Sequence, residues 1–145
     1  MKWDINTTHL IKKAQQRLYF LRQLKKFHVN KHLLVLFYKA IIDSVITASI
    51  SVWYGNSDCR TKMKLERVVT KASNIIGCDL PSVLSLYAER SLNRAKNIIR
   101  DSSHPSHDFF ELLPSGRRYR SMRAGTTRLN NSFFPSAIRP LNSQS

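Results

Sequence analysis

Acidic residues, glycine and cysteine are scarce in this sequence of 145 residues, which has only 9 Asp+Glu, 4 Gly and 2 Cys. So little glycine excludes a collagen-like chain, and two cysteines are too few for a disulfide-stapled scaffold. Because Cys59 and Cys78 are far apart and no apolar secretory leader opens the sequence, we expect a reducing, intracellular setting, nucleus or cytoplasm. The length suits one small domain, or two minimal ones, with a real hydrophobic core.

Catalytic motifs are also lacking. The sequence has no glycine-rich phosphate loop, no serine-nucleophile or zinc-protease motif, and no two adjacent acidic residues. Two-metal phosphoryl transfer needs clustered carboxylates, so we expect no enzyme and no metal or other cofactor. His104, His107, Cys59 and Cys78 are potential zinc ligands. However, 18 residues separate the cysteines, which favours ordinary solvated histidines and structural cysteines.

Positive charge, by contrast, is abundant. The 24 Lys+Arg outnumber the 9 Asp+Glu and give a formal net charge of +15. A surface of this sign attracts polyanions. We therefore expect nucleic acid, DNA or RNA, as the partner, contacted through its backbone, with an anionic membrane surface as the second alternative.

Apolar periodicity predicts two long helices in the first part of the chain. The first extends from about residue 8 to 27 and is basic on its polar side, and we expect its Arg17 to pair with an acid inside the bundle. The second extends from about residue 31 to 54. Because Lys39 and Asp43 lie within this apolar stretch, a buried bundle helix is favoured over a membrane span.

The ends of these helices have recognisable signals. Asn30 is a good N-cap for the second helix. The second half of that helix, residues 45–54, is rich in β-branched residues, so a strand there is an alternative. A third helix is predicted from about 59 to 76, ended by Gly77, and a fourth from about 80 to 100.

The sequence changes character after residue 100. Histidine, proline, serine and asparagine become frequent, and from residue 115 onward the charged residues are six arginines with no acid. Tyr119, Phe133 and Phe134 are interleaved with these arginines. Such aromatics can stack on nucleic-acid bases, or they can dock the tail on the helices, and the sequence leaves both alternatives open.

Together these patterns predict an all-α protein. We expect a three- or four-helix bundle with an irregular Arg-rich C-terminal tail, organised as residues 1–56, 57–100 and 101–145. Basic residues of the first helix and of the tail are the expected phosphate contacts. They are Lys12, Lys13, Arg22, Lys25, Lys26, Arg117, Arg118, Arg120, Arg123 and Arg128.

Several short segments spread over nearly the whole chain form a specific series. They are Lys12–Arg22, Phe37–Tyr38, Trp53–Gly55, His104–His107, Leu113–Arg120 and Ser132–Pro135. The series resembles the C-terminal end of the reverse transcriptases of fish-type non-LTR (LINE) retrotransposons. In those proteins this region follows the palm and includes the thumb, a helical bundle that grips the template-primer duplex. The resemblance implies a helical module that contacts nucleic acid and the palm, but the polymerase's paired aspartates are absent.

Residues 12–55 are also similar to the N-terminal segment of an AlkB-type alkylated-DNA-repair homologue. That resemblance implies an accessory segment acting through protein contacts. We do not expect the oxidation or methyl-transfer reactions of that family in this chain. No histidine has an aspartate two residues on to begin a non-haem iron site, and the four glycines do not form the turn of a methyltransferase core. Our expected function is non-catalytic, sequence-tolerant nucleic-acid binding by a fragment of reverse-transcriptase origin.

Overall fold

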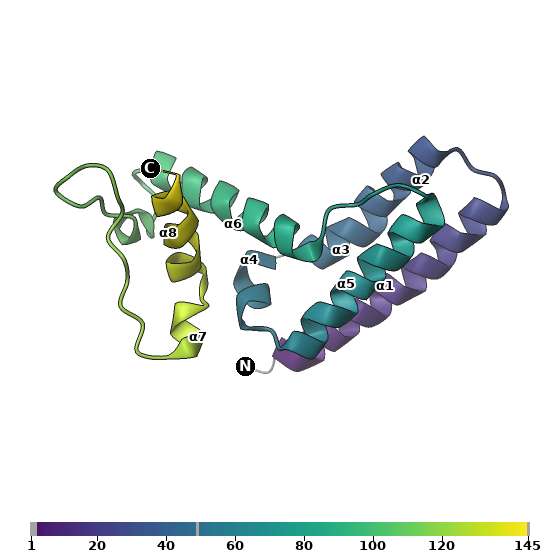
Figure 1. Cartoon of the computed structure of the whole chain (residues 1–145), viewed down its shortest axis with the longest axis horizontal. Coiled ribbons are helices and arrows are strands. Elements are labelled where there is room, and N and C mark those ends of the chain that lie inside the picture. The colour runs from purple at the N-terminus through teal and green to yellow at the C-terminus, as the bar shows by residue number, and fades with distance from the viewer. Residues whose placement is uncertain (1–2, 49, 145) are drawn as a thin grey trace. The chain divides into compact units, whose positions relative to one another are not determined.

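A computed structural model describes residues 3–48 and 50–144, and these are mostly helical (Figure 1). The part of the chain so described has no β-strand, only an isolated antiparallel bridge between Leu112 and Tyr119. The all-α prediction is therefore confirmed. The chain forms two compact units: an N-terminal unit of the residues up to Ile50 together with Ser57–Leu86, and a C-terminal unit of Ser51–Asn56 with Tyr87 and the residues after it.

The N-terminal unit is built on α1, Trp3–Lys26. Its apolar side buries Ile11, Ala14, Leu18 and Leu21, as the periodicity indicated. The helix begins several residues before the predicted start at about residue 8, because the preceding residues include no glycine or proline to stop it. It ends in a turn where His28 adopts a positive φ of 55°.

The second predicted helix is a series of short helical elements with irregular winding. It consists of α2 (Lys31–Phe37), a π-helix η1 (Tyr38–Asp43), α3 (Ser44–Thr47), α4 (Ile50–Trp53) and a 3-10 turn η2 (Tyr54–Asn56). Helix α3 ends at Ala48, where ψ is 113°. The Asn30 side chain accepts a hydrogen bond from the backbone N–H of His32 at 2.9 Å, so the predicted N-cap is confirmed. The alternative of a strand over residues 45–54 is wrong, since every assigned element there is helical.

The stretch Lys31–Asn56 contains an 18-residue window with a mean hydropathy of 1.8, so it is long and apolar enough to cross a membrane on length and composition alone. In the structure its residues Leu34, Ile42 and Ile46 are fully buried against other protein groups. Long apolar helices also occur in the cores of soluble proteins, so length and hydropathy do not distinguish a buried bundle helix from a membrane span. The expectation of a bundle helix therefore stays a prediction.

The third predicted helix is α5, Cys59–Ile76. Asp58 caps it by accepting a hydrogen bond from the Thr61 N–H at 2.9 Å, and hydrogen bonding from Thr61 lowers the pKa of the Asp58 carboxyl below its usual range. Gly77 ends it in the left-handed conformation, with φ 78°, as predicted. The Gly77 carbonyl accepts a hydrogen bond from Lys31 Nζ at 2.8 Å, which ties the end of α5 to the start of α2.

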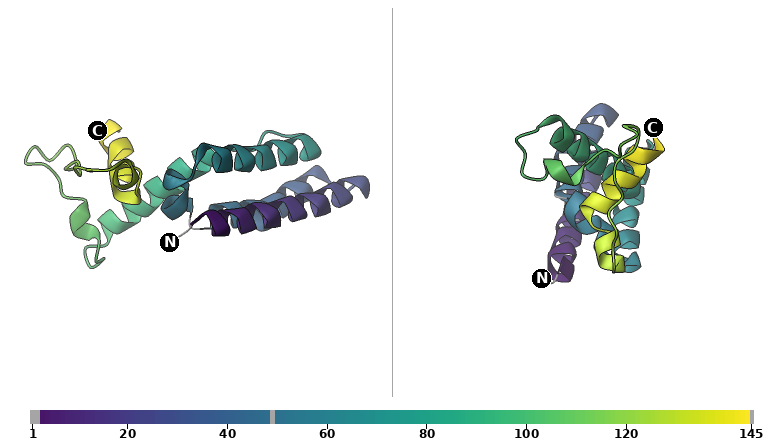
Figure 2. Two further views of the ribbon diagram at one scale, coloured as in Figure 1. Left: turned by 90° about the horizontal axis from the view of Figure 1, so that it is seen from below. Right: turned by 90° about the vertical axis from the view of Figure 1, so that its left-hand side faces the viewer.

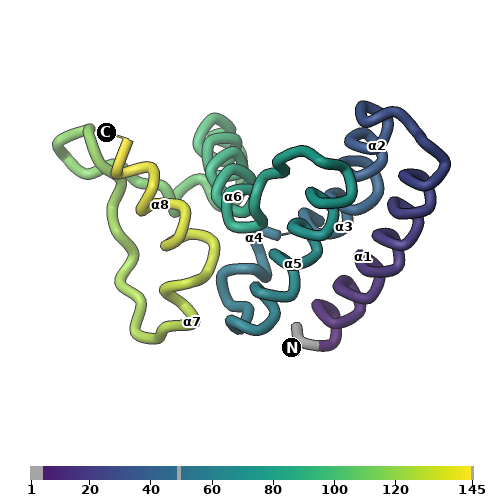
Figure 3. The backbone as a smooth tube through the Cα atoms, turned by 45° about the vertical axis from the view of Figure 1, so that its right-hand side comes forward, coloured from purple at the N-terminus to yellow at the C-terminus, as the bar shows by residue number. Residues whose placement is uncertain are grey.

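Three helical segments, α1, α2–α3 and α5, lie alongside one another in the N-terminal unit (Figures 2 and 3). Helices α1 and α5 run in the same direction and make the most extensive contact (Figure 1). Their shared core includes Leu65, Val68 and Ala72 of α5. Arg17 of α1 donates from Nη1 to the carbonyl oxygen of Ile41 at 2.6 Å, so this arginine is held by η1.

The C-terminal unit is more ordered than the predicted irregular tail. Helix α6 (Val83–Arg100) begins in the N-terminal unit and supplies the C-terminal unit with Ala95 and Ile98. After the 3-10 turn η3 (His107–Phe109), the chain is irregular as far as α7 (Thr127–Asn130) and then forms α8 (Phe133–Ser143). Residues Ala137, Ile138 and Leu141 of α8 close the core of this unit. The last part of the predicted irregular tail is thus helical, because apolar residues recur there at helical spacing.

The two units also depart from the predicted division at residues 56 and 100. Helix α5 joins the N-terminal unit, because its apolar face packs on α1. Residues 51–56 join the C-terminal unit, where Tyr54 lies 4.9 Å from Tyr87 between ring centroids, and Arg94 donates to Ser51 Oγ at 3.1 Å.

The hydroxyl of Tyr38 is buried with no hydrogen-bond partner among the described residues. Burial raises the pKa of Tyr38 above its ordinary value, and the charges of Asp43 and Glu66 act in the same direction. The Tyr38 hydroxyl therefore stays protonated, and it donates to no acceptor among the described residues. Because a buried unpaired hydroxyl is costly, we expect Tyr38→Phe to raise the free energy of unfolding by about 1 kcal/mol.

Urea unfolding followed by circular dichroism measures this difference. Tyr19→Phe is the matched control, because the Tyr19 side chain is exposed and its hydroxyl is hydrated in both states. A Tyr38→Phe protein less stable than the wild type would contradict the prediction.

Candidate nucleic-acid interface

The five basic residues predicted on the first helix are all exposed, but they do not share one face. Successive residues of an α-helix are rotated by about 100°. On α1 this places Lys12, Arg22 and Lys26 on one arc, which we call the α1 row. Lys13 lies about 100° away from Lys12, and Lys25 lies about 140° away on the other side, in the arc of the apolar face at the end of the helix. The structure therefore groups three of the five predicted contacts.

A second row of cations lies on α5. Arg60, Lys64, Arg67 and Lys71 recur at intervals of four, three and four residues, so each helical turn presents one positive charge on the same side. All four residues are exposed. We call them the α5 row. The sequence analysis did not include them among the phosphate contacts, although their spacing is a signal visible in the sequence.

One residue of the α1 row, Lys12, and three of the α5 row line a groove between α1 and α5. We call this the basic groove; its volume is about 340 Å³. The residues that line it are Thr8, Ile11, Lys12, Gln15, Thr61, Lys64, Arg67, Val68 and Lys71. The lining residues include four cations and no acid. Lys12 is the sequence-predicted contact among them.

The electrostatics of the basic groove favour an anion. Lys12, Lys64, Arg67 and Lys71 have like charges, so an anion placed between them relieves their mutual repulsion as well as pairing with each. The sole acid of α5, Glu66, lies on another side of the helix, where its Oε1 accepts a hydrogen bond from the Leu84 N–H at 3.1 Å. It therefore caps the start of α6 instead of neutralising the α5 row.

The predicted tail arginines belong to the C-terminal unit and are all exposed. Arg120 pairs with Glu111 at 3.2 Å, an exposed ion pair. Arg128 lies in the short helix α7, and the other three, Arg117, Arg118 and Arg123, lie in irregular chain. No regular row like that of α5 forms among them, so their expected role as phosphate contacts stays a prediction.

The aromatic residues of the tail dock on the protein. Phe134 packs on Phe110, with 5.7 Å between the ring centroids, and Tyr119 lies 6.3 Å from the same ring. The guanidinium of Arg94 lies over the Phe133 ring, 4.9 Å from its centroid. Of the two alternatives left open by the sequence, these contacts favour docking over base stacking.

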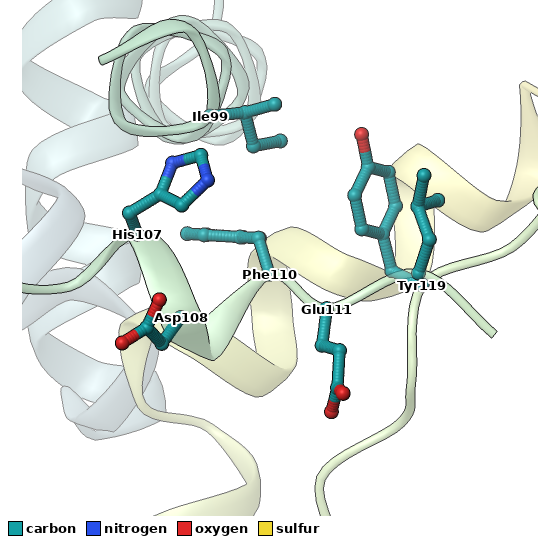
Figure 4. Close-up of a pocket in the computed structure, with 7 residues that line it drawn as sticks. Ile99, His107, Asp108, Phe110, Glu111 and Tyr119 are labelled. Carbon is teal, nitrogen blue, oxygen red and sulfur yellow. The ribbon is translucent and has the colours of Figure 1, made fainter. Parts of the chain in front are cut away.

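The C-terminal unit also has an open hollow of about 570 Å³ beside η3 (Figure 4). Ile99, Phe110 and Tyr119 give it an apolar lining, while the carboxylates of Asp108 and Glu111 point away from Ile99 (Figure 4). Within the described residues no three His, Cys, Asp or Glu side chains gather as metal ligands would. We find no arrangement in this hollow that would activate a nucleophile.

Fold and surface thus define a basic, all-α chain with a groove that four cations line. The family model described as "Alkylated DNA repair protein alkB homolog 8, N-terminal" matches residues 3–44, under a third of the chain. The matched part comprises α1, α2 and η1 and ends at the first residue of α3. No curated protein and no solved structure matches this chain significantly.

Proposed function

We propose that this protein binds nucleic acid through its phosphate backbone, without sequence preference and without catalysing a reaction on it. The observation that supports the proposal is the basic groove, where Lys12, Lys64, Arg67 and Lys71 line one concave surface that has no acidic residue. Lysine and arginine contacts to phosphate supply affinity but no sequence information. A row with one cation per helical turn suits the repeating charge of a polynucleotide.

The resemblance to LINE reverse transcriptases supports the same function and suggests an origin. On this proposal the chain is a thumb-like module of a retrotransposon polymerase, whose palm domain is a further partner. It holds nucleic acid while another domain does the chemistry, because the chain itself has no adjacent carboxylates for two metal ions.

A second candidate function rests on the family match over residues 3–44. Here the chain is an accessory segment of an alkylated-DNA-repair protein and acts through contacts with protein. Exposed apolar side chains on the matched part, Ile5, Phe20 and Leu33 among them, suit such a contact.

Salt dependence tests the first proposal. The purified chain is titrated against fluorescently labelled single-stranded, duplex and RNA–DNA hybrid oligonucleotides at several salt concentrations, with circular dichroism to establish the helical fold. We expect affinity to fall steeply with salt, with a slope of about −0.7 to −0.9 per contacted phosphate, and to vary little with sequence. A helical protein that binds none of these probes at low salt would rule out the first proposal and favour the second.

A further inference from the structure

An exposed aromatic side chain extends the α1 side of the basic groove. Thr8, Lys12, Gln15 and Tyr19 follow one another at intervals of four, three and four residues, and the first three line the groove. The same arc continues to Arg22 and Lys26, so Tyr19 stands between the cations of the α1 row. Its side chain is 56% exposed, and its ring lies edge-on to Phe20 with 5.8 Å between centroids.

The dimensions of the groove suit one polynucleotide strand. The axes of packed helices lie about 8 to 10 Å apart, a spacing comparable with the width of one sugar-phosphate backbone. At a rise of about 1.5 Å per residue, the α1 row is about 21 Å long and the α5 row about 16 Å. Both lengths correspond to a few nucleotides.

Tyr19 adds a feature that a duplex would not use. An aromatic face can stack on a base only when that base is unpaired and splayed from its neighbours. Charged grooves with interspersed aromatics are the usual design of sequence-tolerant single-strand binding. The tail aromatics cannot supply this contact, because Phe133 and Phe134 are docked in the C-terminal unit.

We infer that the basic groove binds a single-stranded segment of nucleic acid, with its backbone between the α1 and α5 rows and one base stacked on Tyr19. The inference rests on the proposed function and makes it specific. It also departs from the duplex-gripping role that the reverse-transcriptase resemblance implies.

The test compares four probes: oligothymidylate, oligouridylate, a duplex, and an abasic oligonucleotide of the same length and charge as the first. We expect the wild-type protein to bind oligothymidylate and oligouridylate more tightly than the duplex. Tyr19→Ala should weaken oligothymidylate binding by about 5- to 150-fold, the range expected for loss of one stacked base. The same substitution should leave binding of the abasic probe unchanged, because that probe keeps the phosphates.

Two variants control for changes in the helix itself. Tyr19→Phe keeps the aromatic face and should bind like the wild type. Phe20→Ala removes the neighbouring ring, which lies about 100° further round α1, and should also bind like the wild type. Equal loss in Phe20→Ala and Tyr19→Ala would overturn the stacking role, as would an unaffected Tyr19→Ala protein.

The outcomes separate this inference from the function on which it rests. If the duplex binds as tightly as the single strands, with steep salt dependence, the single-strand inference is wrong and the proposed function stands. If no probe binds the folded protein at low salt, both are wrong.

Discussion

Replacing Lys64, Arg67 and Lys71 together by glutamine should lower affinity for single-stranded nucleic acid by about a hundredfold near physiological salt. These three side chains form most of the charge in the basic groove, and none of them is part of the apolar core. Their loss removes three phosphate contacts, so the plot of log affinity against log salt should become shallower by about 2. Fluorescence anisotropy over a range of salt concentrations measures both quantities.

A matched control removes the same charge elsewhere in the N-terminal unit. Lys31, Lys39 and Lys62 are absent from the lining of the basic groove and are not among the predicted phosphate contacts. Glutamine at these three positions gives the same net charge, so its effect on affinity should be less than about tenfold. Equal losses in the two triple variants would show that binding follows total charge and does not depend on the groove.

The second large effect concerns stability. We expect Gly55→Ala to destabilise the C-terminal unit by about 3 kcal/mol and to lower its melting temperature by about 12 to 24 °C. A Cβ atom at Gly55 would overlap the backbone carbonyl oxygen of Asn131 and lie 3.0 Å from Tyr87 Oη. A backbone carbonyl cannot rotate away like a side chain, so the 51–56 segment would have to separate from the residues before α8.

Gly125→Ala is the control for this substitution. Nothing lies within 4 Å of a Cβ atom at that position, and no positive φ is required there. The variant should melt like the wild type, or slightly higher because alanine restricts the unfolded chain. A Gly55→Ala protein with an unchanged melting temperature and unchanged near-ultraviolet circular dichroism would contradict the prediction.

Local signals in the sequence were sufficient for the helices whose ends have chemical markers. Asp58 and Gly77 bracket α5, and Asn30 starts α2, because each interacts with backbone groups only a few residues away. The π-helical winding of Tyr38–Asp43 has no such marker. Its residues contact α1, and no local pattern in the sequence describes that contact.

The candidate site was only partly predictable for the same reason. The positive charge of Lys12 was evident, but its partners Lys64 and Arg67 lie more than fifty residues further along the chain. They join it only because the apolar faces of α1 and α5 pack together. Helix α8 contains Pro135 and Pro140, and proline usually indicates that a helix does not form. The helix forms here because proline is tolerated in the first turn and near the end of a helix.

The chain passes between its two units at residues 50, 56 and 86, so neither unit is an uninterrupted stretch of polypeptide. The segment that matches the family model, residues 3–44, contains α1 and α2 but not α5. It therefore holds one wall of the basic groove and lacks α5, the helix that makes the most extensive contact with α1. The matched sequence and the basic groove therefore have different limits: a fragment that keeps the whole groove must extend at least through Lys71.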